Sequence, residues 1–212
     1  PWMGTGHLFD INVMRPVFKA GRIVAYTLSI THLPDVGGTG FSAAASEIYH
    51  EGLRLPIAKL VRAGEIDGFI LDLVRANVRA PDQVLGDLMA NVTCNEVGAE
   101  RLVEFMDEYR LDDLSALSAA IREQSEQLTR ERIAAMRDGH YRNRIEIEGI
   151  EEAIELACEV EVWGQEIAID FAGTGPAVGR GINVPFCYTR AMALYAVKCV
   201  TAPALPNNQG AT

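Results

Sequence analysis

The hydrophobic period of this 212-residue chain changes twice, and these changes limit the folds that it can adopt. Residues 11–18 and 23–30 are rich in β-branched and aromatic side chains around a short turn, which is typical of a β-hairpin. Between 65 and 139 the apolar positions recur every three or four residues, as in amphipathic helices. The period returns to two over 154–171, and a last helical pattern covers 188–200. Strands, helices, strands and a final helix predict an α+β fold rather than a regular alternation of strand and helix.

Turn and capping residues set the expected boundaries of these elements. Asp113 is a suitable N-cap for the third helix, and Gly139 a suitable stop. Pro16 predicts that its strand lies at a sheet edge or carries a bulge. The expected elements are strands at 11–18, 23–30, 154–162 and 166–171, with helices at 43–49, 65–77, 82–109, 113–139 and 188–200.

The pattern divides the chain into three regions: a first hairpin region at 1–64, a helical segment at 65–141, and a second hairpin with a C-terminal helix at 142–212. The chain opens without an initiator Met and ends just after a turn-like stretch. We therefore expect an incomplete, central part of a longer chain.

Composition excludes several classes of protein. Hydrophobic residues make up 49% of the chain, which is ample for a packed core. The net charge of −10 disfavours binding to nucleic acid or to an anionic membrane surface. The four cysteines are scattered with no C-x-x-C pair, which favours a reducing compartment, and we expect a cytoplasmic protein.

The motif His-x-x-Asp occurs twice, immediately before the first strand and immediately after the second. The first copy contributes His7 and Asp10, and the second contributes His32 and Asp35. If the hairpin turn closes at residues 19–22, the two copies meet at the open end of the hairpin. Imidazole and carboxylate groups together are typical ligands of Mn²⁺, Zn²⁺ or Fe²⁺. The sequence therefore predicts a divalent metal site.

Strand alternation complicates this site. In the expected register Phe9 faces His32, and His7 and His32 share one face of the hairpin. Asp10 and Asp35 start on the opposite face, so a four-ligand site requires the strand ends to bend. The alternative is that both motifs are turn devices without a catalytic role.

Other candidate sites are weaker. The glycine-rich stretch at 173–181 matches neither the P-loop nor the dinucleotide-binding spacing, so we expect no nucleotide to bind this chain. Ser42 lacks the second glycine of a nucleophile elbow, and Cys94 has no base nearby in the sequence. Glu51 and Asp87 lie beside glycines and are candidates for groups that support the metal ligands, but their spacing alone does not assign that role.

Eight segments, in order along the whole chain, resemble the hydantoinase B/oxoprolinase family. These are residues 4–10, 16–18, 32–38, 51–56, 77–81, 86–88, 169–174 and 206–210. The family includes B subunits of N-methylhydantoinases, the C-terminal part of 5-oxoprolinases, and α-type subunits of acetone and acetophenone carboxylases.

The resemblance implies an ATP-dependent reaction at a carbonyl group. One branch hydrolyses a five-membered cyclic amide, and the other carboxylates a ketone. It also implies a hetero-oligomer, in which a hydantoinase A-type subunit with an actin-like ATPase fold handles ATP. In the carboxylase branch a divalent, manganese-like metal is held at positions that match His7, Asp10 and His32, with Asp35 as a fourth ligand. A non-catalytic docking segment is the alternative of another class.

Overall fold

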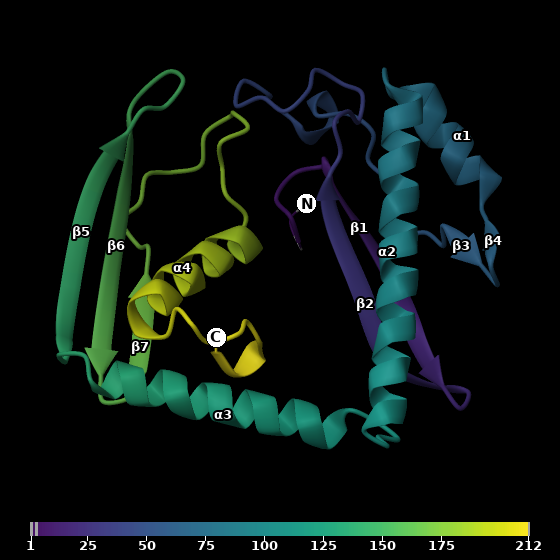
Figure 1. Cartoon of the computed structure of the whole chain (residues 1–212). Coiled ribbons are helices and arrows are strands. Elements are labelled where there is room, and N and C mark those ends of the chain that lie inside the picture. Colours follow the sequence, from purple (N-terminus) through teal and green to yellow (C-terminus); the bar gives the residue numbers. More distant parts are fainter. Residues whose placement is uncertain (1, 3, 212) are drawn as a thin grey trace. The chain divides into compact units, whose positions relative to one another are not determined.

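The computed structural model describes residue 2 and residues 4–211 (Figure 1). Helices and small antiparallel sheets make up the fold, and the expected α+β class is confirmed. The chain divides between two of its helices into two compact units, which are described one at a time below. Unit 1 consists of Pro1–Leu114 with Gly179–Ile182, and unit 2 of Ser115–Val178 with Asn183–Thr212.

Unit 1 begins with a long antiparallel hairpin. Strand β1 (Asp10–Lys19) pairs with β2 (Arg22–His32), as the sequence predicts. The two turn residues, Ala20 and Gly21, have φ angles of 49° and 75°. Positive φ at both central positions is the geometry of a type I′ turn, whose twist matches that of the flanking strands.

A β-bulge interrupts this hairpin a few residues from its turn. Phe18 pairs with Ile23, whereas the preceding residue on β1, Val17, pairs with Ala25. The register therefore moves by one, and Val24 has no partner on β1. The extra residue lies on β2 and not on the strand of Pro16. That strand is instead an edge strand of a two-stranded sheet, which is the other position that Pro16 predicts.

The bulge corrects the register that the sequence predicts at the open end of the hairpin. Asp10 pairs with His32, so the expected pairing of Phe9 with His32 is wrong by one residue. Directly paired residues point to the same face of a sheet, so Asp10 and His32 share a face without any bending of the strand ends.

The helical segment of unit 1 follows a miniature hairpin. Strands β3 (Val61–Arg62) and β4 (Glu65–Ile66) precede α1 (Gly68–Asn77), which begins three residues later than predicted. The Asp67 side chain accepts the Phe69 N–H at 3.1 Å and caps this helix. Helix α2 (Pro81–Glu108) starts with proline, whose fixed φ suits a first helical turn.

The helix predicted at 43–49 is wrong. The structure has only the single 3-10 turn η1 (Ile48–His50) in this stretch. The Ser42 hydroxyl accepts the Ala44 N–H at 3.2 Å. Such local side-chain bonds compete with helical ones and favour a turn.

Helix α2 lies along one face of the β1–β2 hairpin (Figure 1) through polar contacts. The buried amide of Asn95 donates to the Val13 carbonyl at 2.8 Å and to the Ser29 hydroxyl at 2.9 Å. The buried amide of Asn91 donates to the Thr31 hydroxyl at 2.6 Å. These bonds fix the hairpin along the helix axis up to the residue before His32.

A hydrophobic core cluster of unit 1 lies at the open end of the hairpin and includes one residue from inside each His-x-x-Asp motif, Phe9 and Leu33. Its other buried members are Val36, Val74 and Val84.

Unit 2 contains a long helix, a three-stranded antiparallel sheet in the order β5-β6-β7, a second helix and a final 3-10 turn. Its elements are α3 (Ser115–Ala134), β5 (Gly139–Ile147), β6 (Ile154–Trp163), β7 (Glu166–Asp170), α4 (Phe186–Thr201) and η2 (Gln209–Ala211).

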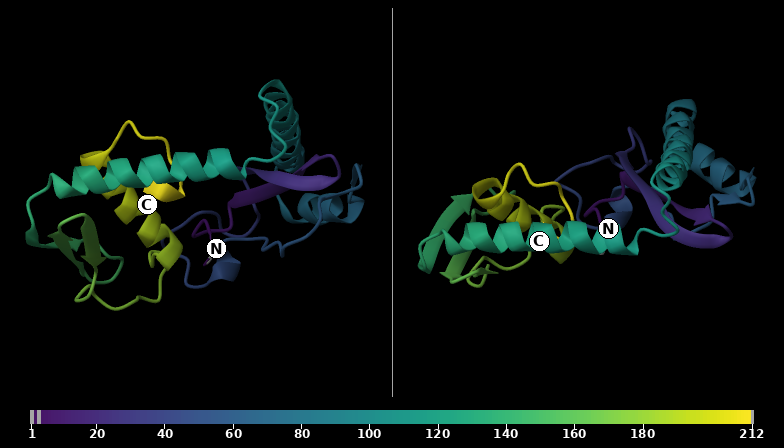
Figure 2. Two further views of the ribbon diagram at one scale, coloured as in Figure 1. Left: turned by 90° about the horizontal axis from the view of Figure 1, so that it is seen from below. Right: turned by 60° about the horizontal axis from the view of Figure 1, so that its bottom comes forward.

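Most of unit 2 agrees with the sequence, except for its first strand and the end of its long helix. Helix α3 ends at Ala134, and Gly139, the predicted stop, is the first residue of β5. The hairpin of β6 and β7 and the last helix are confirmed, whereas β5 is not predicted. Nearly all residues of β5 are exposed, so it lacks the apolar alternation that identifies a half-buried strand. The C-terminal segment lies against α3 (Figure 2), where the Asn208 amide donates to the buried Ser125 hydroxyl at 2.7 Å.

None of the helices in the described part of the chain is both long enough and apolar enough to cross a bilayer.

Candidate metal centre

Three of the four predicted ligands, His7, Asp10 and His32, converge at the open end of the hairpin. The Asp10 carboxylate lies between the two imidazoles, with Oδ2 3.5 Å from His7 Nε2 and Oδ1 3.3 Å from His32 Nδ1. The ring centroids of the two histidines are 5.1 Å apart. One ligand-type atom from each of the three residues lies within 4.8 Å of the others. That spacing allows one ion to contact all three.

The backbone explains this convergence. The bulge aligns Asp10 with His32, and the Leu33 N–H donates to the Phe9 carbonyl at 2.9 Å, which extends the pairing beyond the strand end. His7 precedes β1, after Gly6 with a φ of 87°, and this turn folds it back toward Asp10.

His7 supports a bound ligand at this site. Its Nδ1 atom is buried and has no hydrogen-bond partner among the residues that the structure describes. A buried polar atom without a partner costs about 1–3 kcal/mol, so such atoms are rare unless something else binds there. The donor set of two imidazoles and one carboxylate suits a divalent ion of the Mn²⁺, Fe²⁺ or Zn²⁺ type. The residues present therefore fit a metal.

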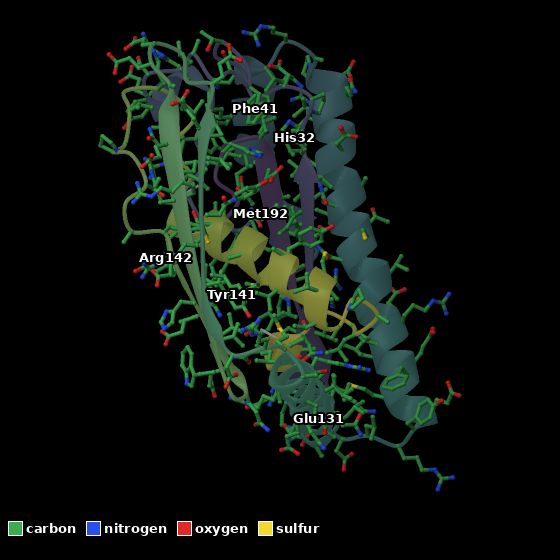
Figure 3. All side chains as sticks on the ribbon, turned by 90° about the vertical axis from the view of Figure 1, so that its left-hand side faces the viewer. His32, Phe41, Glu131, Tyr141, Arg142 and Met192 are labelled. Atoms are coloured by element: carbon green, nitrogen blue, oxygen red, sulfur yellow. The ribbon has the colours of Figure 1, made fainter. Side chains whose placement is uncertain are left out.

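Aromatic side chains surround the two imidazoles. The Phe9 ring stacks on His32, with centroids 5.1 Å apart and planes inclined by 13°. The Phe41 ring lies edge-on to both histidines, at 5.0 Å from His7 and 5.8 Å from His32. Phe41 and His32 are labelled near each other in Figure 3. Phe9 is buried, whereas Phe41 is 66% exposed. The cluster thus has an apolar floor and one exposed aromatic wall.

Asp35, the fourth predicted ligand, is engaged elsewhere in unit 1. Its carboxylate accepts the Gly37 N–H at 2.9 Å, the Arg79 N–H, and the Arg79 guanidinium at 2.8 Å. Desolvation raises the pKa of Asp35, but the backbone N–H bonds and the charge of Arg79 outweigh it and hold that pKa below its usual value. The structure brings Asp35 together with Arg79 and not with the two histidines.

Glu51 is a site residue that the sequence analysis left without a role. Its Oε2 accepts the backbone N–H of Leu8 at 2.8 Å, inside the first His-x-x-Asp motif. The only sequence signal is the Glu-Gly pair in one of the segments that carry the family resemblance. A contact between residues 43 positions apart leaves no periodic pattern.

Apart from Cys94, the weaker candidates have local structural roles. Ser42 caps a turn, as described above. Thr174, in the glycine-rich stretch, makes hydroxyl bonds with both the N–H and the carbonyl of Ala157, at 3.0 and 3.1 Å. Cys94 is exposed on α2. Asp87 accepts the Asn91 amide through its backbone carbonyl at 3.1 Å.

Comparison with known families shows which family the chain belongs to. The hydantoinase B/oxoprolinase family model matches residues 1–212. The chain belongs to this family. Among curated relatives, it is 32% identical to the caprolactamase subunit beta of Pseudomonas jessenii, over 78% of this chain and 29% of that protein. It is 26% identical to 5-oxoprolinase 1 of Arabidopsis thaliana, over 99% of this chain and 19% of that protein.

Two solved structures share its fold. The ATP-dependent caprolactamase of Pseudomonas jessenii matches with a TM-score of 0.88 and 28% identity, over 99% of this chain and 37% of that one. A nucleotide-free acetone carboxylase matches with a TM-score of 0.84 and 18% identity, over 99% of this chain and 30% of that one. The chain thus spans about a fifth to two-fifths of the length of these proteins.

Proposed function

We propose that this chain forms the metal-binding part of an ATP-dependent hydrolase that opens a five-membered cyclic amide. The observation that carries the proposal is the convergence of His7, Asp10 and His32. The buried His7 Nδ1 atom, which has no hydrogen-bond partner among the described residues, supports it. Membership of the hydantoinase B/oxoprolinase family supports the reaction class. The relatives named 5-oxoprolinase and caprolactamase are both, by name, enzymes that act on cyclic amides.

In this proposal His7, Asp10 and His32 hold a divalent ion, with Mn²⁺ as the first candidate and Zn²⁺ or Fe²⁺ as alternatives. The ion supplies Lewis acidity, which polarises a carbonyl oxygen and stabilises the negative charge that develops on it. Two neutral imidazoles and one carboxylate cancel only part of a dication's charge, so the site stays electropositive. Phe9 fixes the plane of the His32 ring by stacking on it.

ATP belongs to a partner in this proposal. The sequence has neither a P-loop nor a dinucleotide-binding spacing, so we assign ATP to a separate hydantoinase A-type subunit with an actin-like ATPase fold. The name of the related caprolactamase subunit beta and the ATP dependence of that caprolactamase support a complex of unlike subunits.

Amide hydrolysis is favoured over ketone carboxylation on the comparisons. The caprolactamase structure is 28% identical to this chain, whereas the acetone carboxylase structure, at 18%, shows a shared fold alone. Carboxylation of a ketone is therefore the second outcome that the experiment must distinguish.

The test is the variant His32→Ala in the full-length subunit, assembled with its ATPase partner. The His32 side chain is 52% exposed at a strand end, so its loss should leave the fold intact. We expect amide opening to fall by about a thousandfold or more, because removal of a ligand forfeits several kcal/mol of transition-state stabilisation. ATP hydrolysis should continue, uncoupled from product formation.

His140→Ala is the matched control, since His140 is 58% exposed and lies on β5 of unit 2. Product analysis with a five-membered cyclic amide and with acetone plus bicarbonate separates the two reactions. Full turnover in His32→Ala would contradict the catalytic role, and carboxylation without amide opening would contradict the substrate class.

A further inference from the structure

We propose that Glu51 is a positioning residue of the metal centre, which sets the relative orientation of His7 and Asp10 by holding the peptide group between them. This inference rests on the proposed function. Glu51 Oε2 accepts the Leu8 N–H at 2.8 Å, and Leu8 stands between the two ligands in the chain. The three residues His7, Asp10 and His32 form the ligand group, so Glu51 acts through the backbone rather than on the ion.

The position of Glu51 is itself fixed by a crossing of two chain segments, 36–39 and 50–53. The Leu53 N–H donates to the Val36 carbonyl at 2.6 Å, and the Thr39 N–H donates to the His50 carbonyl at 2.8 Å. These two bonds lie on either side of Glu51 along the chain. The glutamate therefore comes from a pinned backbone rather than from a free loop.

Glycines make this crossing possible. A Cβ on Gly52 would lie 2.2 Å from the Val36 carbonyl oxygen, and one on Gly38 would lie 2.4 Å from the His50 carbonyl oxygen. Both residues also have positive φ angles, of 133° and 59°. A close backbone contact of this kind leaves little room for Glu51 to withdraw from Leu8.

The Leu8 N–H needs such an acceptor. Leu8 is buried and precedes the first residue of β1 by two positions, before the strand pairing begins. A carboxylate that accepts a backbone N–H makes a stronger bond than a neutral acceptor does. Residues that orient metal ligands by hydrogen bonds, without contacting the ion, typically change metal affinity by about 10–100-fold when they are removed.

If Glu51 acts through this hydrogen bond, metal affinity should depend more on the length of its side chain than on its charge. Glu51→Gln keeps an oxygen acceptor at the same distance, whereas Glu51→Asp keeps the charge but is one methylene shorter. Glu51→Ala removes the contact altogether. Glu47→Ala is the matched control, because Glu47 is a 58% exposed carboxylate on the same loop that pairs with His50.

Binding of Mn²⁺ to the full-length protein in its complex, followed by the electron paramagnetic resonance signal of the free ion, gives the readout without turnover. We expect Glu51→Ala and Glu51→Asp to weaken Mn²⁺ binding by about 10–100-fold. Glu51→Gln should remain within about fivefold of the wild type, because the amide oxygen makes the same bond more weakly. Glu47→Ala should bind as the wild type does. Melting temperatures identify any variant that fails to fold.

Wild-type Mn²⁺ binding in Glu51→Asp, or in a folded Glu51→Ala, would overturn this inference and leave the proposed function standing. Loss of binding in Glu51→Gln as large as in Glu51→Ala would also overturn it, because the residue would then act through its charge. A wild-type complex that binds no Mn²⁺, Zn²⁺ or Fe²⁺ would overturn both.

Discussion

The β1–β2 hairpin and the three-stranded sheet of unit 2 both place histidine beside carboxylates, with different consequences. On the sheet, His140 lies 3.3 Å from Glu159 and 3.4 Å from Glu161, and Glu159 also accepts Arg142 at 2.9 Å. His140 is 58% exposed, so these are solvated contacts between neighbouring strands.

At the hairpin end the charges are not balanced in this way. Two imidazoles share the single carboxylate of Asp10, and among the described residues no lysine or arginine forms an ion pair with it. The Nδ1 atom of His7 is buried and has no hydrogen-bond partner in the part of the chain that the structure describes. The difference teaches that histidine next to carboxylate is not in itself a ligand site. A ligand site is indicated instead where a polar atom at a partly buried position lacks a hydrogen-bond partner.

The largest expected effect is a difference in the free energy of unfolding between two glycine-to-alanine variants, one in each region. Gly52 lies in the crossing behind Glu51, and Gly164 lies in the β6–β7 turn. Both have positive φ, but a Cβ on Gly164 would meet nothing within 4 Å. We expect Gly164→Ala to lower the free energy of unfolding by about 1–2 kcal/mol from left-handed strain alone. Gly52→Ala should lower it by about 3 kcal/mol or more, since its Cβ also meets the Val36 carbonyl.

Urea unfolding of both variants measures this difference. Equal losses would show that the crossing behind Glu51 relaxes freely, and the contrast between the hairpin end and the sheet would weaken.

The second comparison sets buried amides against surface ion pairs. Asn95→Ala leaves the Val13 carbonyl and the Ser29 hydroxyl without their buried donor, so we expect a local loss of about 1–3 kcal/mol. Arg142→Ala removes only an exposed pair with Glu159 and should change stability by less than about 0.5 kcal/mol. Hydrogen exchange of the β1 and β2 amides measures the first loss, and that of the β5 and β6 amides measures the second. A loss on the sheet as large as on the hairpin would break the comparison.

The smallest expected effect is a difference in salt dependence between two carboxylates whose pKa values are both lowered. Hydrogen bonding from Arg142 lowers the pKa of the exposed Glu159, whereas backbone N–H bonds and Arg79 lower that of Asp35 against its desolvation. A lowered pKa means stability that is present above the unfolded-state pKa and lost as the pH falls through the folded-state pKa.

Carbon NMR titration in 0.1 M and 1 M salt distinguishes the two carboxylates. The pKa of Glu159 should rise toward its ordinary value in high salt, because salt screens exposed ion pairs. The pKa of Asp35 should stay low, because salt does not remove its bonds to the Gly37 and Arg79 N–H groups. A salt-insensitive Glu159 would contradict its assignment as a solvated ion pair.

Strong local patterns made much of the fold predictable. The first hairpin, α2 and α4 carry clear periods, and all three form close to the predicted bounds. Strand β5 has exposed residues on both faces, so its sequence lacks the signal. The helix expected at 43–49 was wrong because the Ser42 hydroxyl forms a local turn instead.

The candidate site was predictable only as far as chain order determines it. Motifs on either side of a hairpin must meet, and His7, Asp10 and His32 do lie together, although metal binding by them stays a prediction. The contacts of Asp35 with Arg79 and of Glu51 with Leu8 depend on loop paths that no periodicity encodes.

The bulge on β2 has a consequence for how this hairpin can vary in evolution. Val24 is eight positions before His32, roughly 26 Å along a strand at its usual rise per residue. Loss of that residue would remove the bulge and leave Asp10 opposite His32, whereas loss of any one residue at 25–31 would bring a different neighbour opposite Asp10. The register at the site therefore survives the loss of the bulge residue, while the length of the segment between bulge and site is fixed.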